Sequence, residues 1–122
     1  MNYFENIEIF QSISRQEQED LSDFCQLQHL SSWEVLFREW DAPQALYVIL
    51  DGEISIEKKI HGEAKELAQL WAWEMVGEMA FYGQPPERNA SAIASQDSTL
   101  VVMLFFSLNQ IIQKNPELHL KL

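Results

Sequence analysis

Residues 45–57 read ALYVILDGEISIE, and this stretch decides the fold. Its first part, Ala45 to Leu50, is a short apolar run. Asp51-Gly52 follows and is the strongest short hairpin signal in the chain. From Gly52 to Glu57, polar and apolar residues alternate, which predicts a strand with one buried and one wet face. The stretch therefore predicts β structure with a tight turn at its centre.

Further strand signals lie on both sides of this stretch. Val35-Leu36-Phe37 is another short apolar run, and His61-Gly62 marks another turn. Leu67 to Leu70 begins the next strand, and the last strands are predicted at Ala92–Ala94 and Thr99–Phe106. About eight short strands at close spacing indicate a barrel or jelly roll.

Helical signals are confined to the two ends of the chain. Ser14 and Glu17 have the spacing of a capping box, which predicts a helix from about Arg15 to Gln28. Other helices are predicted over Asn2–Phe10 and Ser107–Gln113, and a last one is opened by Asn115-Pro116-Glu117.

These signals together predict a single domain over residues 1–122 of the α+β class, mainly β. Its centre is an eight-stranded antiparallel jelly-roll barrel, about residues 29–106. N-terminal helices (about 2–28) and C-terminal helices (about 107–122) flank the barrel.

Composition narrows the functional classes. The chain has 122 residues, 47% of them hydrophobic, which suits one folded domain. Its apolar runs are too short to cross a bilayer, so no membrane insertion is expected. Its start shows no secretory signal. The single cysteine, Cys25, excludes an internal disulfide and multi-cysteine metal sites, and we expect a core or half-buried thiol in a cytoplasmic protein.

The net charge of -11 argues against direct nucleic-acid binding and against anionic membranes. The eight Lys and Arg residues are spread along the chain and form no basic patch. Any anion that the protein binds must therefore be held by a local, pre-arranged site.

The segment between Val76 and Ala94 supplies a candidate for such a site. It is longer than a barrel turn requires, and it holds two of the four glycines and two of the four prolines. Gly77 lets a ligand approach the backbone, and a helical turn over Glu78–Tyr82 would point free N–H groups at an anion. Arg88 offers a planar fork of donors for a phosphate.

The residues next to Arg88 and Gly77 sharpen the prediction. Asn89-Ala90-Ser91 offers further N–H groups and small side chains. Glu78 would repel a phosphate, but a carboxylate beside a phosphate site is suited to accept hydrogen bonds from a sugar hydroxyl. The alternative is a surface loop with an incidental Arg–Glu pair.

With these residues the chain resembles the cyclic nucleotide-binding domain family, found in catabolite activator-type transcription factors, cyclic-nucleotide-dependent kinases and gated channels. The family's phosphate-binding cassette is matched by Gly77-Glu78-Met79-Ala80, a ten-residue step from Glu78 to Arg88, and Asn89 to Ala94. Leu46 to Gly52 resembles a characteristic strand and turn. Ile9–Ile13 and Asn115–Leu118 resemble the family's N-terminal helix end and closing helix.

The resemblance implies a regulatory, non-enzymatic module that senses a cyclic nucleotide, cAMP rather than cGMP, with no other cofactor. It implies that Glu78 takes the ribose 2′-hydroxyl and Arg88 the cyclic phosphate. Asn89 stands where the family often has Ser, Thr or Ala, so it bears on the choice of base. The candidate ligand-binding residues are Gly77, Glu78, Met79, Ala80, Arg88, Asn89, Ala90 and Ser91.

Three alternatives remain open at this point. A degenerate family member would bind no nucleotide and mediate protein contacts. The family's long helix that covers the base would begin near Leu122, so either the chain is a fragment or a partner supplies that helix. The resemblance also allows a homodimer, or an output domain or partner that contacts the C-terminal helices.

A cupin-like enzyme needs clustered metal ligands, but His29, His61 and His119 lack metal-ligand spacing. A haem sensor has no evident ligand either.

The four tryptophans stand at unusual positions. In register with the family, Trp33, Trp40 and Trp73 fall where turn glycines are common, and Trp71 falls in a turn where glycine is also frequent. Either the turns have been rebuilt, with the rings on the barrel rim, or UGA codons that mean glycine in the source organism were read as tryptophan. Genuine indoles are expected to be partly exposed at turns.

Overall fold

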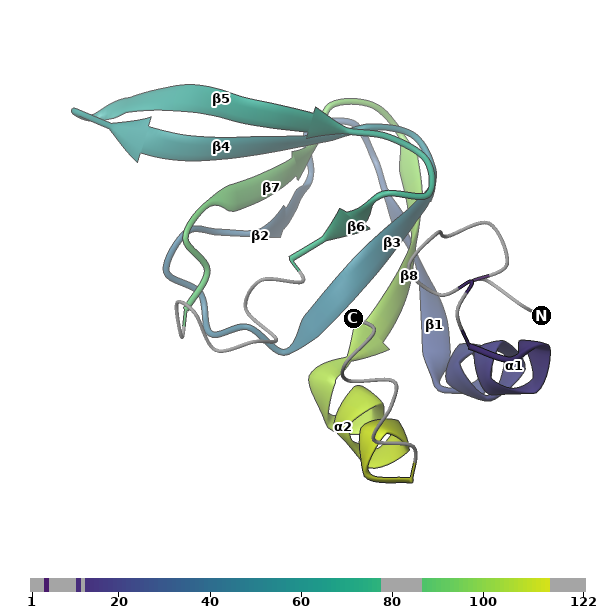
Figure 1. Cartoon of the computed structure of the whole chain (residues 1–122). Coiled ribbons are helices and arrows are strands. Elements are labelled where there is room, and N and C mark those ends of the chain that lie inside the picture. The colour runs from purple at the N-terminus through teal and green to yellow at the C-terminus, as the bar shows by residue number, and fades with distance from the viewer. Residues whose placement is uncertain (1–3, 5–10, 12, 78–86, 115–122) are drawn as a thin grey trace.

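Two four-stranded antiparallel sheets form the body of the chain in the computed structural model, which describes residues 4, 11, 13–77 and 87–114 (Figure 1). The strand orders are β1-β8-β3-β6 and β2-β7-β4-β5. The elements are α1 (Arg15–Asp23), β1 (Cys25–Leu30), β2 (Val35–Phe37), β3 (Ala45–Asp51), β4 (Ile54–Ile60), β5 (Glu63–Leu70), β6 (Met75–Val76), β7 (Ser91–Ala94), β8 (Ser98–Leu104) and α2 (Phe105–Lys114). The predicted eight-stranded, mainly β jelly roll is confirmed.

The two sheets enclose one hydrophobic core, and the helices cover the outer face of the first sheet. The core between the sheets draws residues from both of them: Leu30, Ile49, Ile54, Val76, Ala92, Ala94 and Leu100. A second cluster lies between the first sheet and the terminal segments: Phe4, Ile13, Leu21, Leu46, Val48, Val101, Met103 and Leu108. Strand β3 contributes to both clusters, and this explains its uninterrupted apolar run.

The hairpin predicted at Asp51-Gly52 is wrong. Strand β3 pairs with β8 and β6, whereas β4 pairs with β5 and β7, so the chain crosses here from one sheet to the other. Gly52 adopts φ +103°, and a Cβ on it would lie 2.2 Å from the Ser98 hydroxyl oxygen. The glycine therefore serves a tight crossover between sheets.

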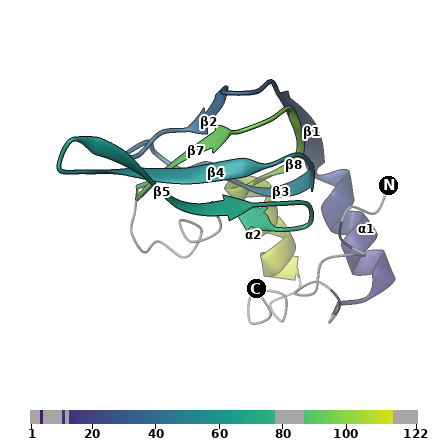
Figure 2. The same cartoon turned by 90° about the horizontal axis from the view of Figure 1, so that it is seen from above.

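The true hairpin joins β4 and β5 through His61 and Gly62, with φ of +54° and +82°. Two consecutive positive φ values are typical of a type I′ turn. The hairpin projects from the rest of the fold (Figures 1 and 2). Strand β5 is one of the two outer strands of its sheet among the described strands, and its side chains from Glu63 to Gln69 are exposed.

Three predicted boundaries need correction. Strand β5 begins at Glu63 rather than at Leu67, because residues 63–66 also pair with β4. The helix expected to reach Gln28 ends at Asp23, because Cys25 to Leu30 pair with β8 instead. At the other end, α2 begins at Phe105 rather than at Ser107. The capping box is confirmed: Glu17 N–H donates to Ser14 Oγ at 3.1 Å, and Ser14 N–H donates to Glu17 Oε1 at 3.0 Å. The helices predicted at Asn2–Phe10 and after Asn115 lie largely or wholly outside the described residues.

The described helices are α1, with nine residues, and α2, with ten. Neither they nor any other helix in the described ranges is long and apolar enough to cross a membrane.

Candidate ligand-binding site around Arg88

The guanidinium of Arg88 lies in the interior of the barrel, and the residue is only 4% exposed. Its Nη1 donates to the carbonyl oxygen of Gly77 at 2.8 Å, and its Nη2 donates to that of Ala45 at 2.5 Å. Gly77 directly follows β6, and Ala45 opens β3. Arg88 therefore links the two strands of the first sheet that stand next to the predicted binding segment.

Aromatic rings surround the rest of the guanidinium. Its Cζ lies 4.1 Å from the ring centroid of Phe37 and 5.9 Å from that of Phe105. The rings of Phe37 and Tyr47 are stacked, with centroids 6.1 Å apart. A cation over an aromatic face is attracted by the ring quadrupole, so these rings hold the guanidinium in place.

Tyr47 also contacts Arg88 through its hydroxyl. Burial raises the pKa of Tyr47 above its usual value, and the positive charge of Arg88 and a hydrogen bond with it partly offset that effect. The phenol of Tyr47 is therefore protonated at neutral pH, and it is uncharged when it forms the hydrogen bond with Arg88.

The backbone of Arg88 is held by the turn that follows β2. Trp40 N–H donates to the carbonyl of Arg88 at 2.7 Å, and Arg88 N–H donates to the carbonyl of Asp41 at 3.0 Å. The Asp41 carboxylate closes this turn by accepting from Arg38 N–H at 2.9 Å. Both the main chain and the side chain of Arg88 are thus fixed.

Gly77 is required where it stands. Its φ is +79°, and a Cβ on it would lie 2.5 Å from Nη1 of Arg88 and 3.3 Å from the ring of Phe37. In this structure the group that lies against Gly77 is the Arg88 guanidinium, and the close approach of a ligand at Gly77 stays a prediction.

The structure describes five of the eight predicted ligand-binding residues. Ala90 is buried next to Arg88, whereas Asn89 is exposed and its carbonyl accepts from Lys58 Nζ at 2.9 Å. Ser91 Oγ accepts from Glu39 N–H at 2.8 Å. Glu78, Met79 and Ala80 lie outside the described residues, so the ribose contact stays a prediction.

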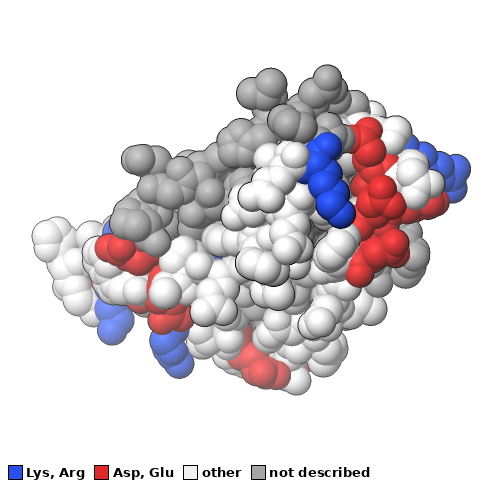
Figure 3. Space-filling model, turned by 90° about the horizontal axis from the view of Figure 1, so that it is seen from below, with Lys and Arg blue, Asp and Glu red and all other residues white. Residues whose placement is uncertain are grey.

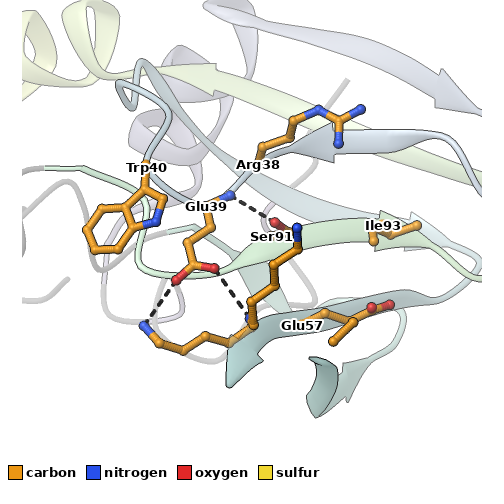
Figure 4. A pocket seen from close by; sticks show the side chains of 9 residues that line it. Arg38, Glu39, Trp40, Glu57, Ser91 and Ile93 are labelled. Carbon is orange, nitrogen blue, oxygen red and sulfur yellow. Dashed lines mark hydrogen bonds and ion pairs between the residues drawn. The ribbon is translucent and has the colours of Figure 1, made fainter. Parts of the chain in front are cut away.

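Ser91 faces an outer groove rather than the buried core. The groove has a volume of about 570 Å³ and lies over the end of β2, β4, β5 and β7 (Figure 4). Its lining residues are Arg38, Glu39, Trp40, Glu57, Lys58, Lys59, Ala64, Ser91 and Ile93. Glu39 is central to it, since its carboxylate pairs with Lys58 Nζ at 3.4 Å and accepts from the Lys59 N–H at 3.4 Å. The groove therefore carries internally paired charges.

Charges elsewhere on the surface are also mixed. On the face shown in Figure 3, the Lys and Arg side chains stand among Asp and Glu side chains. Within the described residues, no group of three or more His, Cys, Asp or Glu could hold a metal ion.

Most of the residues that hold Arg88 were not predicted from the sequence. Phe37, Tyr47 and Asp41 come from segments 41 to 51 residues away from Arg88 along the chain. No local sequence signal marks these three residues, and only the fold shows that they meet Arg88.

Comparison with known proteins gives this arrangement a family. The family model described as "Cyclic nucleotide-binding domain" matches residues 27–115, well over half of the chain. The chain belongs to this family. The predicted resemblance is thereby confirmed, and the matched region of the cyclic nucleotide-binding domain contains the whole Arg88 site.

Individual relatives agree with the assignment. The domain is 30% identical over 82 residues to the Cyclic AMP receptor protein of Thermus thermophilus, covering 66% of this chain and 38% of that protein. Its fold matches the crystal structure of the Thermus thermophilus Catabolite Activator Protein with a TM-score of 0.83 at 24% identity, over 93% of this chain and 53% of that one. The chain thus spans well under two thirds of these relatives.

The same fold also occurs in the regulatory subunit of a cAMP-independent protein kinase A from Trypanosoma brucei. That structure matches with a TM-score of 0.82 at 17% identity, over 88% of this chain and 40% of that one. A match to this fold therefore does not by itself fix the ligand.

Proposed function

We propose that this domain is a regulatory sensor that binds a cyclic nucleotide, cAMP rather than cGMP, with Arg88 holding the phosphate. The observation that carries the proposal is the buried guanidinium of Arg88, fixed by the carbonyls of Gly77 and Ala45. These two hydrogen bonds orient the guanidinium within the barrel. A fixed, desolvated fork of donors is suited to a phosphate.

The remaining roles follow the predicted cassette. Glu78 accepts from the ribose 2′-hydroxyl, and backbone N–H groups of Gly77, Met79, Ala80 and Ala90 complete the phosphate contacts. Asn89 and Ser91 follow Arg88 in this segment. Asn89 is exposed, and Ser91 faces the outer groove. In this proposal the domain works by binding and catalyses no reaction, and we place it in the cytoplasm.

Binding is proposed to act as a switch between two arrangements. A phosphate that attracts the Arg88 guanidinium competes with the carbonyls of Gly77 and Ala45 for the same donors. In this proposal, a bound ligand changes the preferred arrangement of the segment after β6. The terminal helices respond to that change through the first sheet. The C-terminal helices are the proposed contact to a second copy or to an output domain.

One observation favours a second candidate, a degenerate domain that binds no nucleotide and mediates protein contacts. In the described structure the Arg88 guanidinium already bonds to protein carbonyls and packs on Phe37. These contacts give Arg88 a structural role that needs no ligand.

Calorimetric titration with cAMP and cGMP separates the two candidates. The first predicts that cAMP binds and that Arg88→Ala weakens binding by about 2–4 kcal/mol, the usual cost of truncating one partner of a buried charged pair. Arg38→Ala is the matched control, since Arg38 is exposed, and it should bind as the wild type does. The proposal would be overturned if the wild type bound neither cAMP nor cGMP. It would also be overturned if a folded Arg88→Ala variant bound cAMP with the affinity of the wild type.

The ribose contact needs its own measurement. Glu78→Ala and the ligand 2′-deoxy-cAMP each remove one side of the same hydrogen bond. If Glu78 binds the 2′-hydroxyl, the variant and the wild type should bind 2′-deoxy-cAMP with similar affinity, although they differ for cAMP. Additive losses would reject this role for Glu78.

A further inference from the structure

Three turns of the chain share one hydrogen-bond pattern. They span residues 31–34, 38–41 and 71–74. In each, the N–H of the fourth residue donates to the carbonyl of the first: Glu34 to Ser31 at 3.0 Å, Asp41 to Arg38 at 3.1 Å and Glu74 to Trp71 at 3.1 Å. The carboxylate of the fourth residue accepts from the N–H of the first, at 2.9, 2.9 and 2.8 Å.

The third residue of every one of these turns is a tryptophan with a left-handed backbone. The φ values are +73° at Trp33, +76° at Trp40 and +72° at Trp73. The second residues, Ser32, Glu39 and Ala72, do not have positive φ. A positive φ at the third position alone is the pattern of a type II turn, which requires glycine or asparagine there.

The backbone at these positions is fixed by the strands that it meets. Trp33 N–H donates to Ala94, Trp40 N–H to Arg88 and Trp73 N–H to Ile49, at 2.6, 2.7 and 2.6 Å. A change of φ at the tryptophan would break this bond as well as those that close the turn. The turn therefore demands a left-handed residue, and a bulky L-residue there is strained.

The indole rings gain little in return for this strain. Trp33 is 73% exposed, Trp40 is 69% and Trp73 is 41%. Lys58 Nζ lies 5.9 Å from the Trp40 ring centroid, the outer limit of a cation–π contact. The predicted exposure at turns is confirmed, and the rings do not explain why the largest side chain occupies a glycine position three times.

We infer that residues 33, 40 and 73 are glycine in the protein that the source organism makes, and that their codons are UGA, which that organism reads as glycine. Trp71 is outside the inference, because its φ is not positive. The inference rests on the backbone geometry and on the exposure of the rings, and it stands whether or not the domain binds a nucleotide. Glycine at residue 40 would also make the outer groove shallower, because the Trp40 ring forms part of its wall.

Two measurements together decide the question. The genomic codons are determined first, and UGG at any of the three positions overturns the inference. If all three are UGA, mass spectrometry of the protein isolated from the source organism decides how they are translated. The inference is supported if the peptides that contain these positions have the mass expected for glycine. It is overturned if they have the mass expected for tryptophan.

The strain itself is tested on the recombinant chain with a pair of variants at each position. At residues 33, 40 and 73, substitution by glycine should raise the melting temperature, and substitution by alanine should give a lower value than glycine, because alanine keeps the Cβ. At residue 71 the order should reverse, since glycine there only adds freedom to the unfolded chain. The same order at all four positions, with alanine at least as stable as glycine, would remove the physical basis of the inference.

Discussion

The Arg88 guanidinium packs so closely against Gly77 that residue 77 has no room for a side chain. Nη1 of Arg88 donates to the Gly77 carbonyl at 2.8 Å, and the space that a Gly77 side chain would need is taken by the same nitrogen, 2.5 Å away. The position of the guanidinium therefore depends on the absence of a Cβ at residue 77.

Gly77→Ala should destabilise the fold more than Gly62→Ala. Both glycines have a positive φ, near +80°, but a Cβ on Gly62 meets nothing within 4 Å. The strained backbone alone costs about 1–2 kcal/mol of unfolding free energy, which is the expectation for Gly62→Ala. Urea unfolding should show a larger loss for Gly77→Ala, and nucleotide affinity should fall only in that variant. Equal losses in both variants would show that Arg88 is not packed against Gly77.

Asp41→Ala should weaken ligand binding, whereas Glu34→Ala should not. Each variant removes an equivalent carboxylate–N–H bond from a turn, at about 1–2 kcal/mol of unfolding free energy. Of these two turns, that of Asp41 bonds to the backbone of Arg88, whereas that of Glu34 bonds to Ala94. Asp41→Asn keeps an acceptor oxygen and should restore most of the affinity. Unfolding and titration of the three variants check this, and a matching loss of affinity in Glu34→Ala would contradict it.

Tyr47→Phe should test the hydroxyl next to Arg88. Loss of one hydrogen bond predicts a cost of about 0.5–1.5 kcal/mol in unfolding free energy at neutral pH. Because burial raises the pKa of Tyr47 in the folded state, stability should be full below about pH 10, the unfolded value, and fall as the pH rises above it. The variant should lose part of this alkaline decline. An unchanged decline would place its origin elsewhere.

Cys25 should behave as an inert thiol. Burial raises its pKa to about 12, and its Sγ lies 3.2 Å from the carbonyl oxygen of Leu21, to which it donates. The folded protein should react slowly with iodoacetamide at pH 8, and the urea-unfolded protein should react quickly. The raised pKa also means that stability is full below about pH 9 and falls above it, by at most about 1.4 kcal/mol per pH unit. Cys25→Ala should remove that contribution, and fast labelling of the folded protein would disprove the burial.

Local sequence signals predicted the elements well but not always their partners. The capping box at Ser14 and the turn at His61-Gly62 depend only on neighbouring residues, and both were predictable. Asp51-Gly52 signalled a reversal of the chain but could not show that the next strand joins the other sheet. For the same reason the local pattern predicted a helix through Cys25 to Gln28, whereas these residues pair with β8.

The residues of the candidate site also differ in whether local sequence signals predict them. Gly77 and Arg88 stood out because their segment was too long for a barrel turn. Phe37, Asp41 and Tyr47 carry no such mark, since a half-buried aromatic or a turn aspartate is ordinary in a strand-rich sequence. Their meeting with Arg88 follows from the order of strands in the two sheets, which only the three-dimensional structure supplies.

The exposed outer strand β5 bears on how the domain behaves in concentrated solution. Such a strand presents unpaired backbone groups to which another chain could add a strand. Here charged residues occupy much of it, with Glu63, Lys65 and Glu66 all exposed. In a chain of net charge -11 they discourage stacking of one copy on the next. The colloidal stability of the domain is therefore tied to its acidity, and it should decline as the pH approaches the isoelectric point near 4.5.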